Sequence, residues 1–108
     1  MLVGHSTGGY AVTAAAASGL VEPAALCVVD GVVLDDRLTT PMTIVLADDG
    51  LYTSRRDEVR AIVHAVPGRR LVEISSNHNV PMTRPADLAA VIVDLVRGRA
   101  STSGGDAD

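Results

Sequence analysis

Residues 1–9 read MLVGHSTGG and carry the densest chemical signal in the chain. A short apolar stretch leads into G-x-S-x-G around Ser6, and an Ala-rich segment of helical pattern follows over residues 7–18. A sharp turn between a strand and a helix holds a serine hydroxyl exposed above the sheet edge, where a base can reach it. We expect side chains in place of Gly4 and Gly8 to collide across this turn. The stretch therefore predicts a nucleophile elbow with Ser6 as the nucleophile.

Two other interpretations of this loop are open. A Gly/Ser-rich loop between a strand and a helix is also found as a purely structural turn or as a cradle for a phosphate group. A phosphate-binding module would keep its anion affinity after Ser6→Ala. The dinucleotide fingerprint G-x-G-x-x-G fits less well, because Ser6 stands where its second glycine belongs.

Short apolar runs alternate along the chain with segments of helical periodicity. Nearly continuous apolar runs are typical of strands that are covered on both faces, and this alternation predicts an α/β fold with a parallel sheet and flanking helices. Residues 99–108 are small, polar and acidic, which predicts a disordered tail after a domain of residues 1–98. The expected strands are 1–3, 25–29, 43–46 and 70–74, and the expected helices are 7–18, 54–65 and a last one from about 85 that ends at Gly98.

Composition excludes several classes of partner. The 108-residue chain has a net charge of −4 and 2% aromatic residues, so neither a basic footprint nor a stacking platform for nucleic acid is expected. The single cysteine, Cys27, lies in an apolar run and is interpreted as a buried small hydrophobe. The N-terminus lacks the pattern of a signal peptide, and the Ala-rich stretch is too short and too polar to span a bilayer. We expect a cytoplasmic protein without membrane association.

Three stretches resemble one known family. Residues 4–9 (GHSTGG), 25–31 (ALCVVDG) and 75–96 (SSNHNVPMTRPADLAAVIVDLV) are similar to the second half of an α/β-hydrolase, from the nucleophile elbow onward. The resemblance covers about residues 1–98. It implies a partial α/β-hydrolase fold that lacks the N-terminal strands, the loop with the second oxyanion N–H, and the cap domain. It also implies that His5 lines the substrate pocket.

The general base is chosen among three histidines. His64 falls off the apolar stripe of its predicted helix and reads as a surface residue, and His5 is inside the elbow. His78 follows a predicted strand, and loops at the carboxyl ends of parallel strands share one edge of the sheet. Ser6 and His78 are therefore expected to face the same crevice, with His78 as general base.

The acid that orients this base is left open between two positions. Asp30 ends one predicted strand, and Asp48 and Asp49 end the next, so each is at a carboxyl end. The resemblance favours the Asp48/Asp49 pair by its usual position, whereas some members, including certain thioesterases, carry the acid at the position of Asp30. Alternatively, Asp30 merely caps a turn with Gly31.

The expected chemistry is acyl transfer to water through an acyl-enzyme on Ser6, with the Thr7 N–H as one oxyanion donor. The partner is a small-molecule ester, thioester or amide, and neither a cofactor nor a metal is expected, because no histidine pair has ligand spacing. The alternative is an inert hydrolase remnant or association module that needs a partner for the missing half. Such a chain would self-associate, or bind a partner chain, through the exposed edge of its sheet.

Overall fold

The computed structural model describes residues 1–31, 33 and 38–101. Its centre is a sheet of four parallel strands in the order β1-β2-β3-β4, which confirms the predicted α/β class. Side chains of β2 and of most of β3 are buried, as expected for strands covered on both faces. The strands are β1 (Leu2–His5), β2 (Leu26–Val29), β3 (Met42–Asp49) and β4 (Arg69–Asn77).

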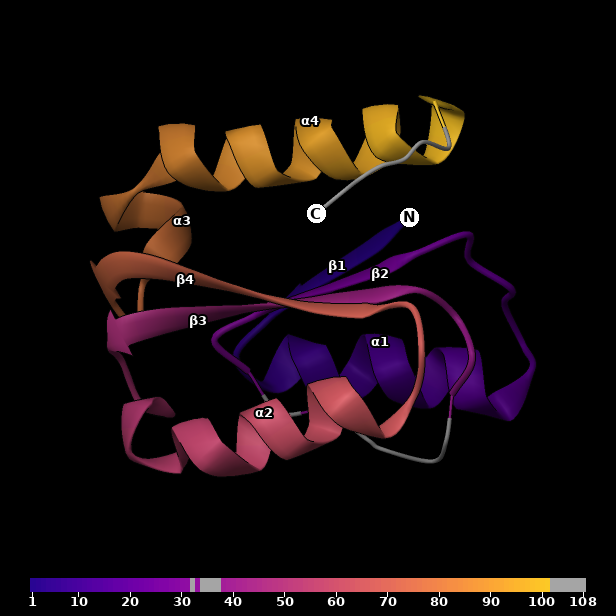
Figure 1. Cartoon of the computed structure of the whole chain (residues 1–108), viewed down its shortest axis with the longest axis horizontal. Helices are drawn as coiled ribbons and strands as arrows, with labels where there is room; N and C mark the ends of the chain where they lie inside the picture. The colour runs from indigo at the N-terminus through magenta and orange to yellow at the C-terminus, as the bar shows by residue number, and fades with distance from the viewer. Residues whose placement is uncertain (32, 34–37, 102–108) are drawn as a thin grey trace.

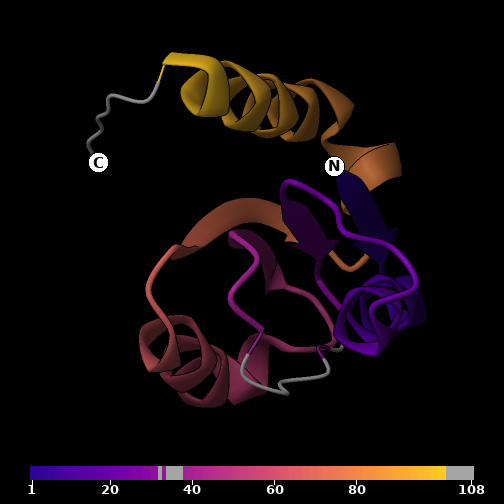
Figure 2. The same cartoon turned by 90° about the vertical axis from the view of Figure 1, so that its right-hand side faces the viewer.

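Helices cover both faces of this sheet. Helices α1 (Thr7–Ser18) and α2 (Arg56–Ala65) lie on one face, and α4 (Pro85–Ser101) lies on the other (Figures 1 and 2). A 3-10 turn, η1 (Thr53–Arg55), precedes α2, and a short helix, α3 (Val80–Thr83), joins β4 to α4. This arrangement brings the carboxyl ends of all four strands to one edge of the molecule.

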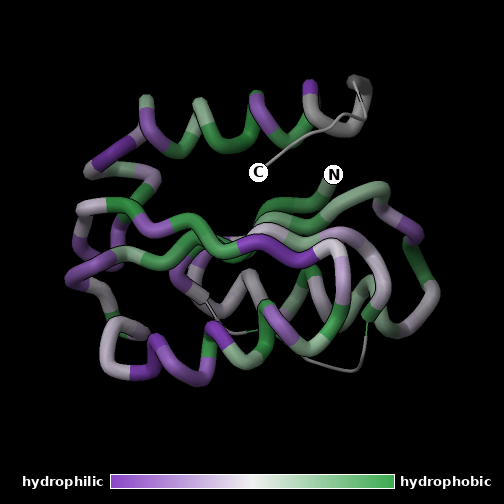
Figure 3. Tube along the Cα trace, in the orientation of Figure 1, coloured by the Kyte–Doolittle hydropathy of each residue, from purple (hydrophilic) through white to green (hydrophobic). Residues whose placement is uncertain are grey.

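The core has two layers because neighbouring side chains of a strand point to opposite faces. Hydrophobic residues concentrate in the strands and on the side of α4 that faces them (Figure 3). Figure 3 also shows that the outer side of α4 combines polar residues with weakly hydrophobic ones. The layer under α4 contains Cys27, Val29, Val45, Ala47, Ile74, Val80 and Leu88. The layer over α1 and α2 contains Leu26, Val28, Leu38, Met42, Ile44 and Val63.

Several boundaries differ from the sequence predictions, and the main differences are in β3, β4 and α4. Strands β3 and β4 are longer than expected, because their carboxyl ends continue to pair with each other beyond the apolar runs, through Asp49 and Asn77. Helix α4 does not end at Gly98, as predicted, but continues to Ser101, into the segment for which a disordered tail is expected. A single glycine weakens a helix by only about 1 kcal/mol and need not end it. The rest of that tail, 102–108, lies outside the described residues.

Candidate active site

The serine turn lies between β1 and α1. Ser6 has φ 58° and ψ −125°. Residues other than glycine rarely adopt this backbone conformation, and the surrounding structure holds it here. Its N–H donates to the carbonyl of Val29 at 3.1 Å, and its own carbonyl accepts from the N–H of Gly9 at 3.0 Å. The turn is therefore fixed to β2 on one side and to the first turn of α1 on the other.

Only one of the two elbow glycines lies where a side chain would not fit. A Cβ on Gly4 would overlap the backbone of Gly8 and Gly9, so β1 and the start of α1 approach each other at a position where only glycine fits. A Cβ on Gly8 would meet nothing within 4 Å. The expectation of a collision is thus confirmed for Gly4 and was wrong for Gly8, which faces away from β1.

Asp30 follows β2 directly and turns into the protein. It is 1% exposed and has φ 43°, one of two positive φ values among the described non-glycine residues. Aspartate tolerates this region better than most residues. Its carboxylate accepts hydrogen bonds from the N–H of Ala47 at 3.0 Å, through Oδ1, and of Leu51 at 3.3 Å, through Oδ2. Backbone donors from the end of β3 and the following loop thus satisfy a buried carboxylate.

His78 is the side-chain partner of Asp30. Nδ1 of His78 lies 2.5 Å from Oδ2 of Asp30, and the His78 side chain is 21% exposed. Because an ionised carboxylate only accepts, Nδ1 carries the shared proton and Nε2 is left as the basic nitrogen. The structure therefore joins one of the predicted acids to the predicted base, 48 residues apart in sequence.

His5 connects the elbow to the histidine loop. Its Nε2 lies 2.8 Å from the carbonyl oxygen of His78, and the two rings are 4.8 Å apart between centroids. A carbonyl only accepts, so Nε2 of His5 is the donor. Strands β1 and β4 are at opposite edges of the sheet, so this bond reaches across the carboxyl ends of β2 and β3. His5 thus binds protein backbone, a role that its position beside Ser6 did not predict.

The other candidate residues are placed apart from this pair. Asp48 and Asp49 are exposed residues of β3 itself, and Oδ1 of Asp48 accepts from the N–H of Ser76 at 3.0 Å. The structure therefore brings Asp30 to His78 and does not bring the Asp48/Asp49 pair there. Thr7 is the exposed first residue of α1, where helix N–H groups have no carbonyl of their own helix to bind.

Tyr52 is a further neighbour of His78, and no sequence motif indicated it. Its ring centroid lies 6.2 Å from that of His78. It belongs to the loop after β3 that also supplies the N–H of Leu51 to Asp30. The available signal was compositional, since Tyr52 is one of two tyrosines in a chain without Phe or Trp and follows a predicted strand at the site edge.

The described part of the chain contains no helix that is both long and apolar enough to cross a membrane.

Comparison with known proteins supports the fold. No protein-family model and no curated protein sequence matches the chain. Among solved structures, it is similar to a "predicted CIB-like hydrolase" from Thermoplasma acidophilum, with a TM-score of 0.71 and 19% sequence identity. The match covers 89% of this chain and 49% of that one, so the chain spans about half the length of its structural neighbour. The four parallel strands and their helices thus form an α/β fold that is also found in half of a protein described as a hydrolase.

Proposed function

We propose that this chain is, or forms part of, a cytoplasmic serine hydrolase that cleaves small acyl substrates through an acyl-enzyme on Ser6. The observation that carries the proposal is the 2.5 Å contact between His78 Nδ1 and the buried Asp30 carboxylate, at the sheet edge where Ser6 stands in a strained turn. A serine at such a turn, a histidine and a buried aspartate are the three parts that activate a hydroxyl for acyl transfer. The hydrolase description of the structural neighbour agrees with this class.

The reaction follows from the tautomer of His78. With Nδ1–H directed at Asp30, Nε2 takes the proton of the Ser6 hydroxyl while Oγ forms a bond to the substrate carbonyl carbon. The carbonyl oxygen becomes an oxyanion, for which the Thr7 N–H at the start of α1 is a donor. Collapse of this intermediate breaks the bond to the leaving group, which receives the proton from Nε2. Water then repeats the sequence on the acyl-enzyme and releases the acid.

The proposal is tested by labelling the folded chain with a fluorophosphonate and measuring its intact mass. We expect one label per chain, which is lost in Ser6→Ala and in His78→Gln and retained in Ser54→Ala, a matched change at an exposed serine. Circular dichroism of each variant checks that it is folded. A folded chain without label, or a label that persists in Ser6→Ala, would contradict the proposal.

A second candidate function is association of two copies through β1. This strand is at the edge of the sheet, and its Val3 is 44% exposed. The outward N–H and C=O groups of an edge strand offer hydrogen bonds to a further strand. We expect a dimer by sedimentation velocity that Val3→Lys dissociates and that Val93→Lys, on α4, leaves intact. A monomer at all concentrations would contradict this function.

A further inference from the structure

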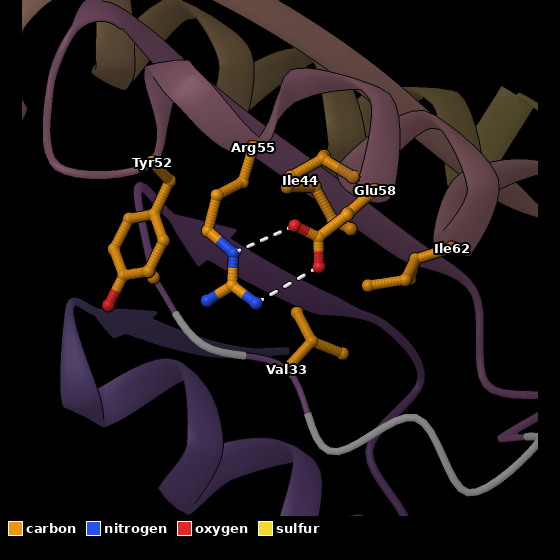
Figure 4. Close-up of a pocket in the computed structure, with 8 residues that line it drawn as sticks. Val33, Ile44, Tyr52, Arg55, Glu58 and Ile62 are labelled. Carbon is orange, nitrogen blue, oxygen red and sulfur yellow. Dashed lines mark hydrogen bonds and ion pairs between the residues drawn. The ribbon is translucent and has the colours of Figure 1, made fainter.

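A small cavity lies beside the candidate active site. It occupies about 130 Å³ between the sheet and α2, on the face opposite α4. Its wall is mainly apolar, since Ile44 comes from β3, Val59 and Ile62 come from α2, and Val33 follows β2. Figure 4 shows Tyr52 at one end of this space and Ile62 at the other.

The charged residues of the lining form a pair with each other. Arg55 and Glu58 form a two-pronged ion pair, with Nε to Oε2 at 3.0 Å and Nη2 to Oε1 at 2.9 Å, and their side chains are 59% and 62% exposed. In Figure 4 the pair lies across the space between Tyr52 and Ile62. Because the two charges satisfy each other, the cavity presents apolar surface to a ligand rather than a free charge.

Two lining residues connect the cavity to the catalytic groups. Gly31 is in its wall, and a Cβ on Gly31 would overlap the carbonyl oxygen of Ser6, so only bare backbone separates the cavity from the serine turn. Tyr52 is in its wall as well and has its ring 6.2 Å from that of His78. The cavity thus borders the backbone of the serine turn and the tyrosine ring that neighbours His78.

We propose that this cavity receives the acyl chain of the substrate, so that the enzyme prefers esters or thioesters of short fatty acids. This inference rests on the proposed function of Ser6. An apolar cavity of about 150 Å³ holds one benzene molecule, so this slightly smaller one accommodates a chain of about four to six carbon atoms. Longer chains exceed its volume. Charged acyl groups are disfavoured, because Arg55 and Glu58 are already paired with each other and most of the remaining lining is apolar.

The test uses fluorophosphonates that differ only in the alkyl group on phosphorus, from methyl to decyl, with the labelling rate of Ser6 followed by intact mass. Burial of each methylene contributes up to about fourfold, so we expect the rate to rise from methyl to butyl or pentyl and to fall for octyl and decyl. A rate that is independent of chain length, or that rises steadily to decyl, would overturn the inference. It would leave the proposed function intact, because Ser6 would still be labelled.

Two variants of one residue place the selectivity in this cavity. Val59→Phe fills the space and is expected to lower the ratio of butyl to methyl rates, whereas Val59→Ala enlarges it and moves the optimum to a longer chain. Val93→Phe, on the exposed side of α4, is the matched control and keeps the wild-type ratio. An unchanged ratio in both folded Val59 variants would overturn the inference. Absence of any Ser6 label in the wild type would overturn both the inference and the proposed function.

Discussion

Two neighbouring strands of the sheet each carry aspartate at the carboxyl end, yet the two ends differ in structure. After β2, Asp30 turns inward with φ 43° and is 1% exposed, and its carboxylate binds His78 and two backbone N–H groups. At the end of β3, Asp48 and Asp49 are still strand residues and are exposed. The path of the backbone therefore decides which carboxylate becomes part of a site. Position after a strand does not decide it alone.

The cause lies in how long each strand continues to pair. Strand β2 ends at Val29, whereas β3 continues alongside β4 to the pair Asp49–Asn77, with an irregularity in register between Ala47 and Asp49. The continuing strand leaves Asp48 to bind the N–H of Ser76 in β4. Backbone N–H groups of Ala47 in β3 and Leu51 after it donate to Asp30. One strand end thus supplies the carboxylate of the site, and the other supplies the backbone donors that bind it.

Exchanging one carboxylate for an amide is expected to have the largest effect. Asp30→Asn replaces one accepting oxygen by an NH2 donor and removes the charge, so the tautomer of His78 is no longer fixed, and we expect Ser6 labelling to slow by about 10⁴-fold. Asp48→Asn is the matched control at the neighbouring strand end and is expected to label at the wild-type rate. Equal losses in both variants, measured by intact mass on folded chains, would break the distinction between the two ends.

A methyl group placed against Asp30 tests how tightly the carboxylate is held. A Cβ on Gly50 would lie 2.5 Å from Oδ2 and 2.8 Å from Oδ1 of Asp30, so Gly50→Ala must shift either the carboxylate or the loop that packs against it. A displacement of about 1 Å can cost about 10²-fold in rate. We therefore expect a loss of that size in Ser6 labelling. A wild-type rate in a variant with native circular dichroism would show that the Asp30 geometry does not control reactivity.

The bond from His5 to the histidine loop is expected to have a smaller effect. A hydrogen bond contributes about 0.5–1.5 kcal/mol, so His5→Leu is expected to slow Ser6 labelling by up to about tenfold. His5→Gln keeps a side-chain N–H donor and is expected to recover most of the rate. If both variants lose the same amount, the ring of His5 matters for another reason than its bond to the His78 carbonyl.

The smallest effect concerns the buried strand itself. Burial raises the pKa of the Cys27 thiol in β2 from 9.0 to about 11. We expect no reaction of the folded chain with thiol reagents at neutral pH and reaction upon unfolding. The unfolded thiol ionises first as pH rises, so its contribution to stability is present below the ordinary pKa and is lost toward pH 11. Rapid reaction of Cys27 in the folded chain at neutral pH would show that β2 is less buried than the structure indicates.

The sequence predicted the features that depend on local pattern. The order of strands and helices, the turn at Ser6 and the loop position of His78 follow from apolar runs, glycine spacing and strand ends. The choice between Asp30 and the Asp48/Asp49 pair did not follow, because it depends on how far β3 pairs with β4 beyond its apolar run. The bond from His5 to the His78 carbonyl is equally non-local, since it joins one edge strand, β1, to the loop after the other, β4.

Proton NMR of the imidazole of His78 tests the pairing of His78 with Asp30 most directly. A proton shared between Nδ1 and a buried carboxylate gives a far-downfield resonance that does not depend on turnover or on substrate choice. We expect this resonance to be present in the wild type and in Asp48→Asn and absent in His78→Gln and Asp30→Asn. A resonance that persists in Asp30→Asn and disappears in Asp48→Asn or Asp49→Asn would contradict this pairing.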